Sequence, residues 1–309
     1  MQVSHICNIR CRYCFHSLSP EKKKANPHFH NSLVSMETVE CVCEQLGDFP
    51  CSFKSCRICG MGEPLCHPQF EQICDMLKAT GKIEYLSFFS NGLLLTRERS
   101  EKLISSGADR IMISLQGLNA ESYRKICGAD IDFPNFVGEI KYLYENRGNM
   151  GVHIKIADVA LAPGEDTKFY DMFGEMCDDM FIGPTVPMFS KEGVQYTDEI
   201  SAKSSQYGIE SDMFEVCPQP FYMTDVTVTG DVIPCCDYFN PVLGNIHEKR
   251  LIDIWNGEQR ELCKQLLRFE ASSLPYCKNC VSKYVGIHWK EEHLDDCAAG
   301  VLKRYEVNN

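Results

Sequence analysis

The sequence predicts an α/β protein, an open, partial (β/α)6 barrel over residues 1–183 followed by a small α+β domain over residues 217–309. Two observations support this. In the first half, short apolar runs alternate with segments whose apolar residues recur every three or four positions, as in strands alternating with helices. In the last third, a hairpin-like segment and a short helical segment lie between groups of cysteines. Residues 184–216, interrupted by glycine and proline, are expected to bridge the two parts.

The individual elements follow from local signals. Residues 1–5 leave room for one short strand, and the first helix is expected between the capping residue Ser35 and Gly47. Six strands alternating with helices imply parallel pairing through right-handed crossovers, and six units are fewer than the eight of a closed barrel. The further strands are expected at 53–59, 83–90, 110–115, 151–161 and 179–183, and the further helices at 68–80, 97–106, 120–127, 134–146 and 166–177.

Composition restricts the functional class. The chain has 309 residues with 44% hydrophobic and 24% charged residues, and its net charge is -12. This charge disfavours nucleic acid and membrane surfaces as partners, because both require a broad basic surface. No apolar run is long enough to span a membrane. Nineteen cysteines without a secretory segment indicate a reducing cytoplasm, where thiols bind metals or pack in the core.

Three cysteines, Cys7, Cys11 and Cys14, are spaced as CxxxCxxC within one short loop. Three thiolates can bind three irons of a 4Fe–4S cube and leave the fourth iron open to a small ligand. The loop, with the aromatic Phe15 after the last cysteine, resembles the signature of the radical S-adenosylmethionine (SAM) enzymes. This resemblance implies a partial α/β barrel that binds SAM at the open iron of the cluster.

Other interpretations of the loop remain open. Zinc usually takes four ligands, and no partner pair lies near this triplet. A disulfide framework would require an oxidising compartment. The cysteines could also be buried core residues.

A turn after the strand at 53–59 carries Gly60-Met61-Gly62-Glu63-Pro64. It resembles the GGEP motif of the family, with Met61 in place of the first glycine. The resemblance implies that this turn binds the amino group of SAM through backbone oxygens and Glu63. Glycine permits close backbone approach, and a carboxylate attracts an ammonium group. The alternative is a plain structural turn.

Polar residues end the next strands of the predicted barrel. Asn91 follows one strand, and Ser114 and Gln116 end the next. These residues resemble the polar strand ends that face SAM or substrate in the family, and Ser114 is predicted to contact the ribose. Lys155, on the strand at 151–161, points either into the barrel or to solvent.

A second group of cysteines lies in the last third. Cys217, Cys235, Cys277 and Cys280 form a four-thiolate set, in which Cys236 could replace Cys235. Their order, with Leu243-Gly244-Asn245-Ile246 between them, resembles the C-terminal extension called SPASM or, in its single-cluster form, twitch. Because only Cys297 follows the last pair, we expect one auxiliary 4Fe–4S cluster. Taken alone, the cysteines of this part of the chain also fit a zinc site.

The resemblance implies reductive cleavage of SAM and removal of a hydrogen atom from a substrate, with electrons from a reductant such as flavodoxin or ferredoxin. We expect oxidation of a small polar metabolite, since the chain begins at its first strand without a leader-binding domain. Epimerisation with Cys236 as the catalytic hydrogen donor, or modification of a peptide or protein, are alternatives. A non-enzymatic iron–sulfur electron carrier or zinc module is a further alternative, which the turn at 60–64 disfavours.

Overall fold

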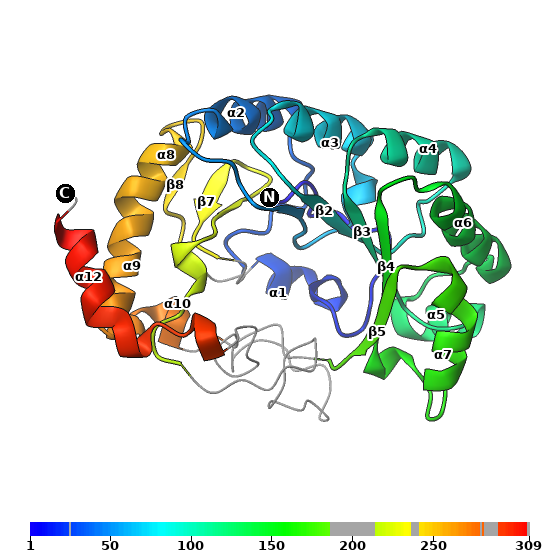
Figure 1. Cartoon of the computed structure of the whole chain (residues 1–309). Helices are drawn as coiled ribbons and strands as arrows, with labels where there is room; N and C mark the ends of the chain where they lie inside the picture. Colours follow the sequence, from blue (N-terminus) through cyan, green and yellow to red (C-terminus); the bar gives the residue numbers. More distant parts are fainter. Residues whose placement is uncertain (25, 186–213, 236–240, 279, 281–289, 308–309) are drawn as a thin grey trace.

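A computed structural model describes most of the chain. Residues 25, 186–213, 236–240, 279, 281–289 and 308–309 are not described and are drawn as a grey trace in Figure 1. Most of the predicted bridge and Cys236 lie outside the described residues, so the domain limits remain a prediction.

A parallel sheet of five strands forms the first part of the molecule, in the order β1-β2-β3-β4-β5. Its helices lie along the outer side of the sheet (Figure 1). The partial α/β barrel expected from the alternating pattern is therefore confirmed. The strands are β1 (Cys56–Ile58), β2 (Leu86–Ser90), β3 (Arg110–Leu115), β4 (Gly151–Ala157) and β5 (Asp179–Gly183).

The helices of this part begin and end close to the predicted positions. Ser35 caps α2 by accepting a hydrogen bond from the Thr38 amide, and Thr96 caps α4 in the same way. The helices are α1 (Pro20–Lys24), α2 (Met36–Leu46), α3 (Phe70–Ala79), α4 (Arg97–Ser105), α5 (Ala120–Cys127), α6 (Phe133–Asn146) and α7 (Asp166–Phe173). Their apolar sides cover fully buried strand residues such as Ile58, Phe88 and Ile111.

The N-terminal segment differs from the prediction. Residues 1–5 do not form a sixth strand of the sheet, because their backbone pairs elsewhere. Ser4 forms an isolated antiparallel bridge with Leu33, and the Val34 amide donates to the Val3 carbonyl at 3.0 Å. The Gln2 amide donates to the Val226 carbonyl at 2.8 Å, which ties this segment to the C-terminal part.

Several predicted elements are too long. The strand expected at 53–59 covers only Cys56–Ile58, and the strand expected at 83–90 begins at Leu86. The strand expected at 151–161 ends at Ala157, where a 3-10 turn over Asp158–Ala160 begins. The helix expected at 166–177 ends at Phe173 and continues as a 3-10 turn, Gly174–Met176.

The C-terminal part has a small antiparallel sheet in the order β6-β7-β8. The predicted hairpin turn lies at Gly230, whose φ of 84° suits glycine and where a Cβ would lie 2.8 Å from the His247 ring. The elements are β6 (Asp225–Val226), β7 (Asp231–Ile233), β8 (Gly244–Asn245), α8 (Leu251–Ile254), a π-helical turn (Trp255–Gln259), α9 (Arg260–Leu267), α10 (Pro275–Lys278) and α12 (Ala298–Val307).

Helices α2 and α8 join the two parts. The Gln45 side chain donates to the Ile246 carbonyl at 2.8 Å and accepts from the Leu251 amide at 2.6 Å. Arg250 forms ion pairs with Glu44 and Asp48. The helices of the C-terminal part therefore continue the arc of helices around the barrel (Figure 1). None of the described helices is long and apolar enough to cross a membrane.

Candidate active site

The predicted cluster loop lies at one edge of the barrel. Cys11 is buried, whereas Cys7 and Cys14 are half-buried, and the Cys14 amide donates to the Cys11 carbonyl at 2.9 Å. Burial raises the pKa of the Cys7 thiol to about 12, and the neighbouring Cys14 thiol adds to this effect. Binding iron would therefore release protons from these thiols, which would become stable as thiolates at the metal.

Helix α5 holds this loop in place. Its last carbonyls, from Ile126 and Cys127, accept hydrogen bonds from the Arg12 and Arg10 amides at 2.9 and 3.1 Å. The Cys127 thiol also forms a hydrogen bond with the Cys11 thiol, which together with burial raises the pKa of Cys11. Cys127 belongs to neither of the two cysteine groups identified from the sequence. Its spacing gives no sign of this contact, which depends on the docking of α5.

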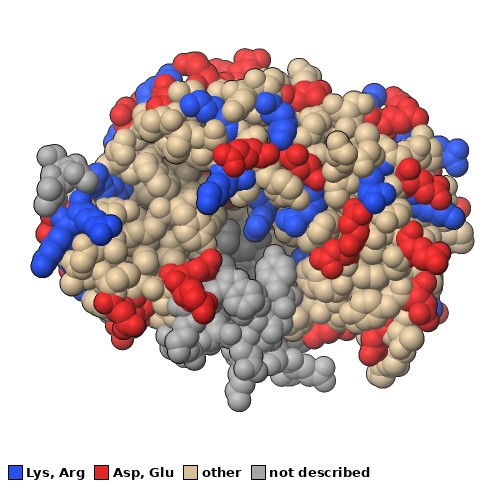
Figure 2. Space-filling view, viewed as in Figure 1, with Lys and Arg blue, Asp and Glu red and all other residues tan. Residues whose placement is uncertain are grey.

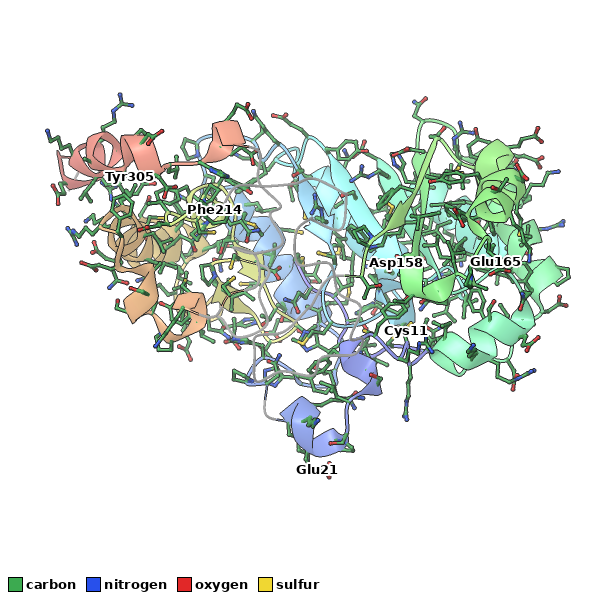
Figure 3. The ribbon with its side chains drawn as sticks, turned by 90° about the horizontal axis from the view of Figure 1, so that it is seen from below. Cys11, Glu21, Asp158, Glu165, Phe214 and Tyr305 are labelled. Carbon is green, nitrogen blue, oxygen red and sulfur yellow. The ribbon has the colours of Figure 1, made fainter. Side chains whose placement is uncertain are left out.

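Figure 3 shows Cys11 beside the segment that carries Asp158, while Glu21 in α1 projects away from the barrel. The Arg12 guanidinium donates to the Val159 carbonyl at 3.4 Å. The cluster loop thus lies at the carboxyl end of β4, the end of a parallel sheet where ligands usually bind.

The predicted SAM-binding turn packs directly on this loop. The Glu63 amide donates to the Ile6 carbonyl at 2.8 Å, and a Cβ at Gly62 would lie 2.5 Å from the same oxygen. Only glycine fits there. Met61 is buried against Phe15, and its carbonyl accepts a hydrogen bond from the His16 ring. The carbonyls of Gly60 and Gly62 accept no hydrogen bond from the described residues and so remain available to an ammonium group.

Glu63 joins the turn to the end of β2. Its carboxylate is buried and accepts hydrogen bonds from the Leu65 amide, the Ser90 hydroxyl and the Asn91 amide at 3.0, 2.8 and 2.6 Å. Burial raises the pKa of Glu63, and these three donors oppose the shift. These contacts make Glu63 a residue that positions the turn. Pro64 begins the following 3-10 turn, Pro64–Cys66.

The other predicted polar residues also meet the cluster loop. The Asn91 amide group donates to the Asn8 side chain at 2.7 Å and lies 4.0 Å from the Cys7 sulfur. The Gln116 side chain donates to the Ser114 carbonyl at 3.0 Å and accepts from the Tyr13 hydroxyl. Tyr13, inside the cysteine motif, is therefore a site residue that the sequence reasoning missed.

The four predicted auxiliary ligands are brought together. Cys217, Cys235, Cys277 and Cys280 line one hollow, which also has apolar walls of Leu262 and Leu266. Within the described part of the chain, no three His, Cys, Asp or Glu side chains converge on a single metal ion. A four-iron cluster holds its thiolates apart around a cube, so this arrangement fits a cluster better than a single zinc ion.

Gln259 organises two of the segments that carry these cysteines. This side chain is buried, and its amide group donates to the Pro220 and Met223 carbonyls at 2.7 and 2.9 Å and lies 3.5 Å from the Pro234 carbonyl. Pro220 follows Cys217, and Pro234 precedes Cys235. The π-helical turn that ends at Gln259 is a rare conformation, frequent at functional sites.

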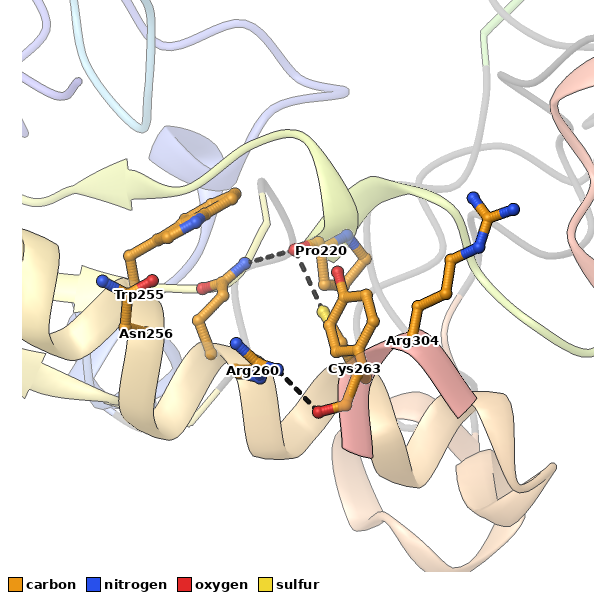
Figure 4. A pocket seen from close by; sticks show the side chains of 8 residues that line it. Pro220, Trp255, Asn256, Arg260, Cys263 and Arg304 are labelled. Carbon is orange, nitrogen blue, oxygen red and sulfur yellow. Dashed lines mark hydrogen bonds between the residues drawn. The ribbon is translucent and has the colours of Figure 1, made fainter. Parts of the chain in front are cut away.

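A separate cavity of about 180 Å³ is lined by Pro220, Trp255, Arg304 and Tyr305, among others. Figure 4 shows Trp255 and Arg304 at opposite ends of this group of residues. None of the residues of the cysteine loop or of the turn at 60–64 lines this cavity. It is therefore not the place where SAM would bind.

Known families match both parts of the chain. A model described as the Radical SAM superfamily matches residues 1–156, and one described as an iron-sulfur cluster-binding domain, SPASM, matches residues 217–281.

Curated relatives match part of the chain. The GTP 3',8-cyclase of Rippkaea orientalis is 35% identical over 122 residues, which are 40% of this chain and 35% of that protein. The GTP 3',8-cyclase of Aliarcobacter butzleri is 25% identical over 239 residues, 77% of this chain and 67% of that protein. The chain thus spans about a third of the length of the first of these relatives.

Solved structures share the fold over most of the chain. BtrN in complex with AdoMet and 2-DOIA has a TM-score of 0.56 at 21% identity, covering 94% of this chain and 95% of that chain. Native anSMEcpe with bound AdoMet has a TM-score of 0.61 at 17% identity, covering 99% and 95%. SuiB of Streptococcus suis bound to its precursor peptide has a TM-score of 0.61 at 16% identity, covering 82% and 63%.

Proposed function

The chain belongs to the Radical SAM superfamily and carries a C-terminal SPASM iron–sulfur domain, and from this premise we propose that it oxidises a small polar metabolite such as an alcohol, an aminocyclitol or a sugar. We further propose that it works in the cytoplasm and receives electrons from a flavodoxin or ferredoxin.

The observation that carries this proposal is the hollow lined by four thiols, Cys217, Cys235, Cys277 and Cys280. Four protein ligands leave no open position at the auxiliary cluster, so an electron acceptor is its simplest role. In such an oxidation the substrate would lose one hydrogen atom, one electron and one proton; bound SAM would supply the acceptor of the hydrogen atom and the auxiliary cluster the acceptor of the electron, and the proton would leave to solvent.

The protein's own residues hold and shield these groups. Cys7, Cys11 and Cys14 would bind the first cluster, and the carbonyls of Gly60 and Gly62 would accept the SAM ammonium group. Ser114 would lie at the SAM ribose, on the strand that Gln116 and Tyr13 tie to the cluster loop. Because these contacts connect the strand end to the loop, SAM and cluster would be held in one fixed arrangement.

The relatives and the structural neighbours leave other substrates open. The curated relatives are named as cyclases of GTP, and SuiB was solved with a precursor peptide. BtrN, solved with AdoMet and 2-DOIA, matches 94% of this chain. At 21% identity this neighbour supports the fold alone, so the substrate is established only by assay.

The test is anaerobic incubation of the cluster-loaded protein with SAM, a reductant and a panel of candidate metabolites in deuterated water, followed by mass analysis. We expect 5′-deoxyadenosine together with a product two hydrogens lighter than its substrate. The Cys236→Ala variant should retain this turnover. A product of unchanged composition that carries solvent deuterium, and that is lost in Cys236→Ala, would instead establish an epimerase.

A further inference from the structure

The interior side of the barrel sheet carries basic side chains. Ile58, Phe88, Ile111 and Val152 are aligned across β1 to β4, and all four are fully buried. Because successive strand residues point to opposite sides, the residues adjacent to this row face the interior. Arg57 on β1 and Arg110 on β3 share one interior row, since both align with Ser87.

Lys155 extends this basic lining toward the SAM site. It aligns with Ser114 on β3 and with Phe181 on β5, so it lies on the same side of the sheet as the proposed ribose contact. Its ammonium nitrogen is 5.3 Å from the centre of the Phe89 ring, and the Arg57 guanidinium carbon is 5.9 Å from the same centre. Lys155 and Arg57 therefore both lie against the same aromatic ring.

No carboxylate neutralises these three cations within the described residues. Lys155, Arg57 and Arg110 have no ion pair there, and the half-buried Arg110 stacks on Tyr85 with its Nε atom buried and lacking a hydrogen-bond acceptor. Asp179, an acid that aligns with His153 on this side of the sheet, is 3.5 Å from the His153 ring instead.

The absence of a described ion pair at these three residues contrasts with half-buried basic residues elsewhere in the barrel. Lys78 pairs with Asp109, Arg99 with Glu71 and Arg147 with Asp178, at 2.9, 2.6 and 2.6 Å. Those ion pairs connect elements of the fold. In a chain of net charge -12, three unneutralised cations on the interior side point to a ligand that supplies the negative charge. Figure 2 shows lysine and arginine side chains at the rim of the hollow in the middle of the molecule.

We propose that Lys155 and Arg57, with Arg110 behind them, bind an anionic group of the substrate, a phosphate or a carboxylate. The proposal rests on the proposed function, because it places a substrate beside SAM. It also restricts the substrate to small metabolites that carry such a group, and disfavours uncharged sugars and alcohols. Guanidinium and ammonium groups bind phosphate and carboxylate oxygens through charge-assisted hydrogen bonds.

Lys155 also has the environment of a ligand-binding lysine. Burial lowers its pKa, because the charged form loses hydration. An anion bound beside it would oppose this shift and stabilise the ammonium form. Met112 and Phe89 on the same side of the sheet would exclude water from this contact and strengthen it.

Isothermal titration calorimetry on the anaerobic, cluster-loaded and SAM-saturated protein tests the proposal, with inorganic pyrophosphate and succinate as separate probes. We expect saturable binding of at least one probe, and the probe that binds identifies the group as phosphate or carboxylate. Lys155→Met should weaken that binding about tenfold or more and Arg57→Met about threefold, while Lys155→Arg retains most of it.

Lys141→Met is the matched control, since Lys141 is an exposed residue on α6 that pairs only with Glu145. Absence of saturable binding of both probes, or an equal loss in Lys141→Met and Lys155→Met, would overturn the proposal. Reductive SAM cleavage without substrate is measured on the same samples. Its absence in both the wild type and Lys141→Met would refute the proposed function, whereas SAM cleavage by these two proteins without saturable binding of either probe would refute the anion site alone.

Discussion

The loop that would bind the first cluster takes its three thiols from one continuous segment, whereas the auxiliary site takes its four from Cys217, Cys235 and the pair Cys277 and Cys280. The first is fixed by backbone contacts, because α5 and the turn at 60–64 bond to the loop's own amides and carbonyls. The second is fixed by a side chain, Gln259, which bonds to the segments around Pro220 and Pro234. A contiguous site thus depends on the surrounding fold, and a dispersed site depends on single bridging residues.

The largest effect is expected at Glu63, the buried side chain that joins the turn packed on the first loop to the end of β2. Glu63→Ala removes the acceptor of three hydrogen bonds and leaves the Ser90 hydroxyl and the Asn91 amide buried without a partner. We expect a loss of about 3 kcal/mol in the free energy of unfolding, because each unsatisfied buried donor costs about 1–3 kcal/mol. SAM affinity should also fall, because the turn at 60–64 loses its support. Denaturant titration measures the free energy of unfolding, and equilibrium binding measures the SAM affinity.

Glu98→Ala, at an exposed residue of α4 that pairs with Lys102, is the matched control and should change neither quantity. If Glu63→Ala kept the stability and the SAM affinity of the wild type, the turn at 60–64 would not depend on this carboxylate.

A smaller and more selective effect is expected at the auxiliary site. Gln259→Leu keeps the size of the side chain but removes its bonds to the Pro220 and Met223 carbonyls. Without these bonds the segments of Cys217 and Cys235 should be held less closely, so we expect the iron content to fall by up to half, while SAM cleavage at the first cluster persists. Iron analysis and electron paramagnetic resonance of the reduced protein measure the two clusters separately.

The same substitution on the neighbouring helix, Gln265→Leu, serves as the control. An unchanged auxiliary resonance in Gln259→Leu would show that the cysteine segments keep their positions without this residue, and would remove the contrast between the two sites.

Much of the barrel follows from local pattern. The periodicity from Ser35 to Gly183 places the five strands and their helices, because buried strands and amphipathic helices differ in period. The site residues found by spacing, Cys7, Cys11 and Cys14 with Gly62 and Glu63, do lie together.

The remaining contacts depend on the tertiary structure. The N-terminal segment pairs with Leu33 and Val226, which are distant in the sequence. The local pattern of residues therefore does not predict this pairing. Cys127 meets Cys11 only because α5 docks against the loop. Gln259 resembles any polar helical residue in the sequence, and its role depends on a π-helical turn that directs it inward. Such residues are recognised by their partners rather than by their spacing.

The central claim is that the chain holds two separate iron–sulfur clusters, of which only the first cleaves SAM. Its most direct test is iron analysis with an assay for 5′-deoxyadenosine on the wild type, on the triple variant with alanine at Cys7, Cys11 and Cys14, and on the double variant with alanine at Cys277 and Cys280. We predict about eight irons in the wild type and about four in each variant, with 5′-deoxyadenosine made by the double variant and absent in the triple variant. Zinc in place of iron, or a triple variant that kept all its iron, would contradict the claim.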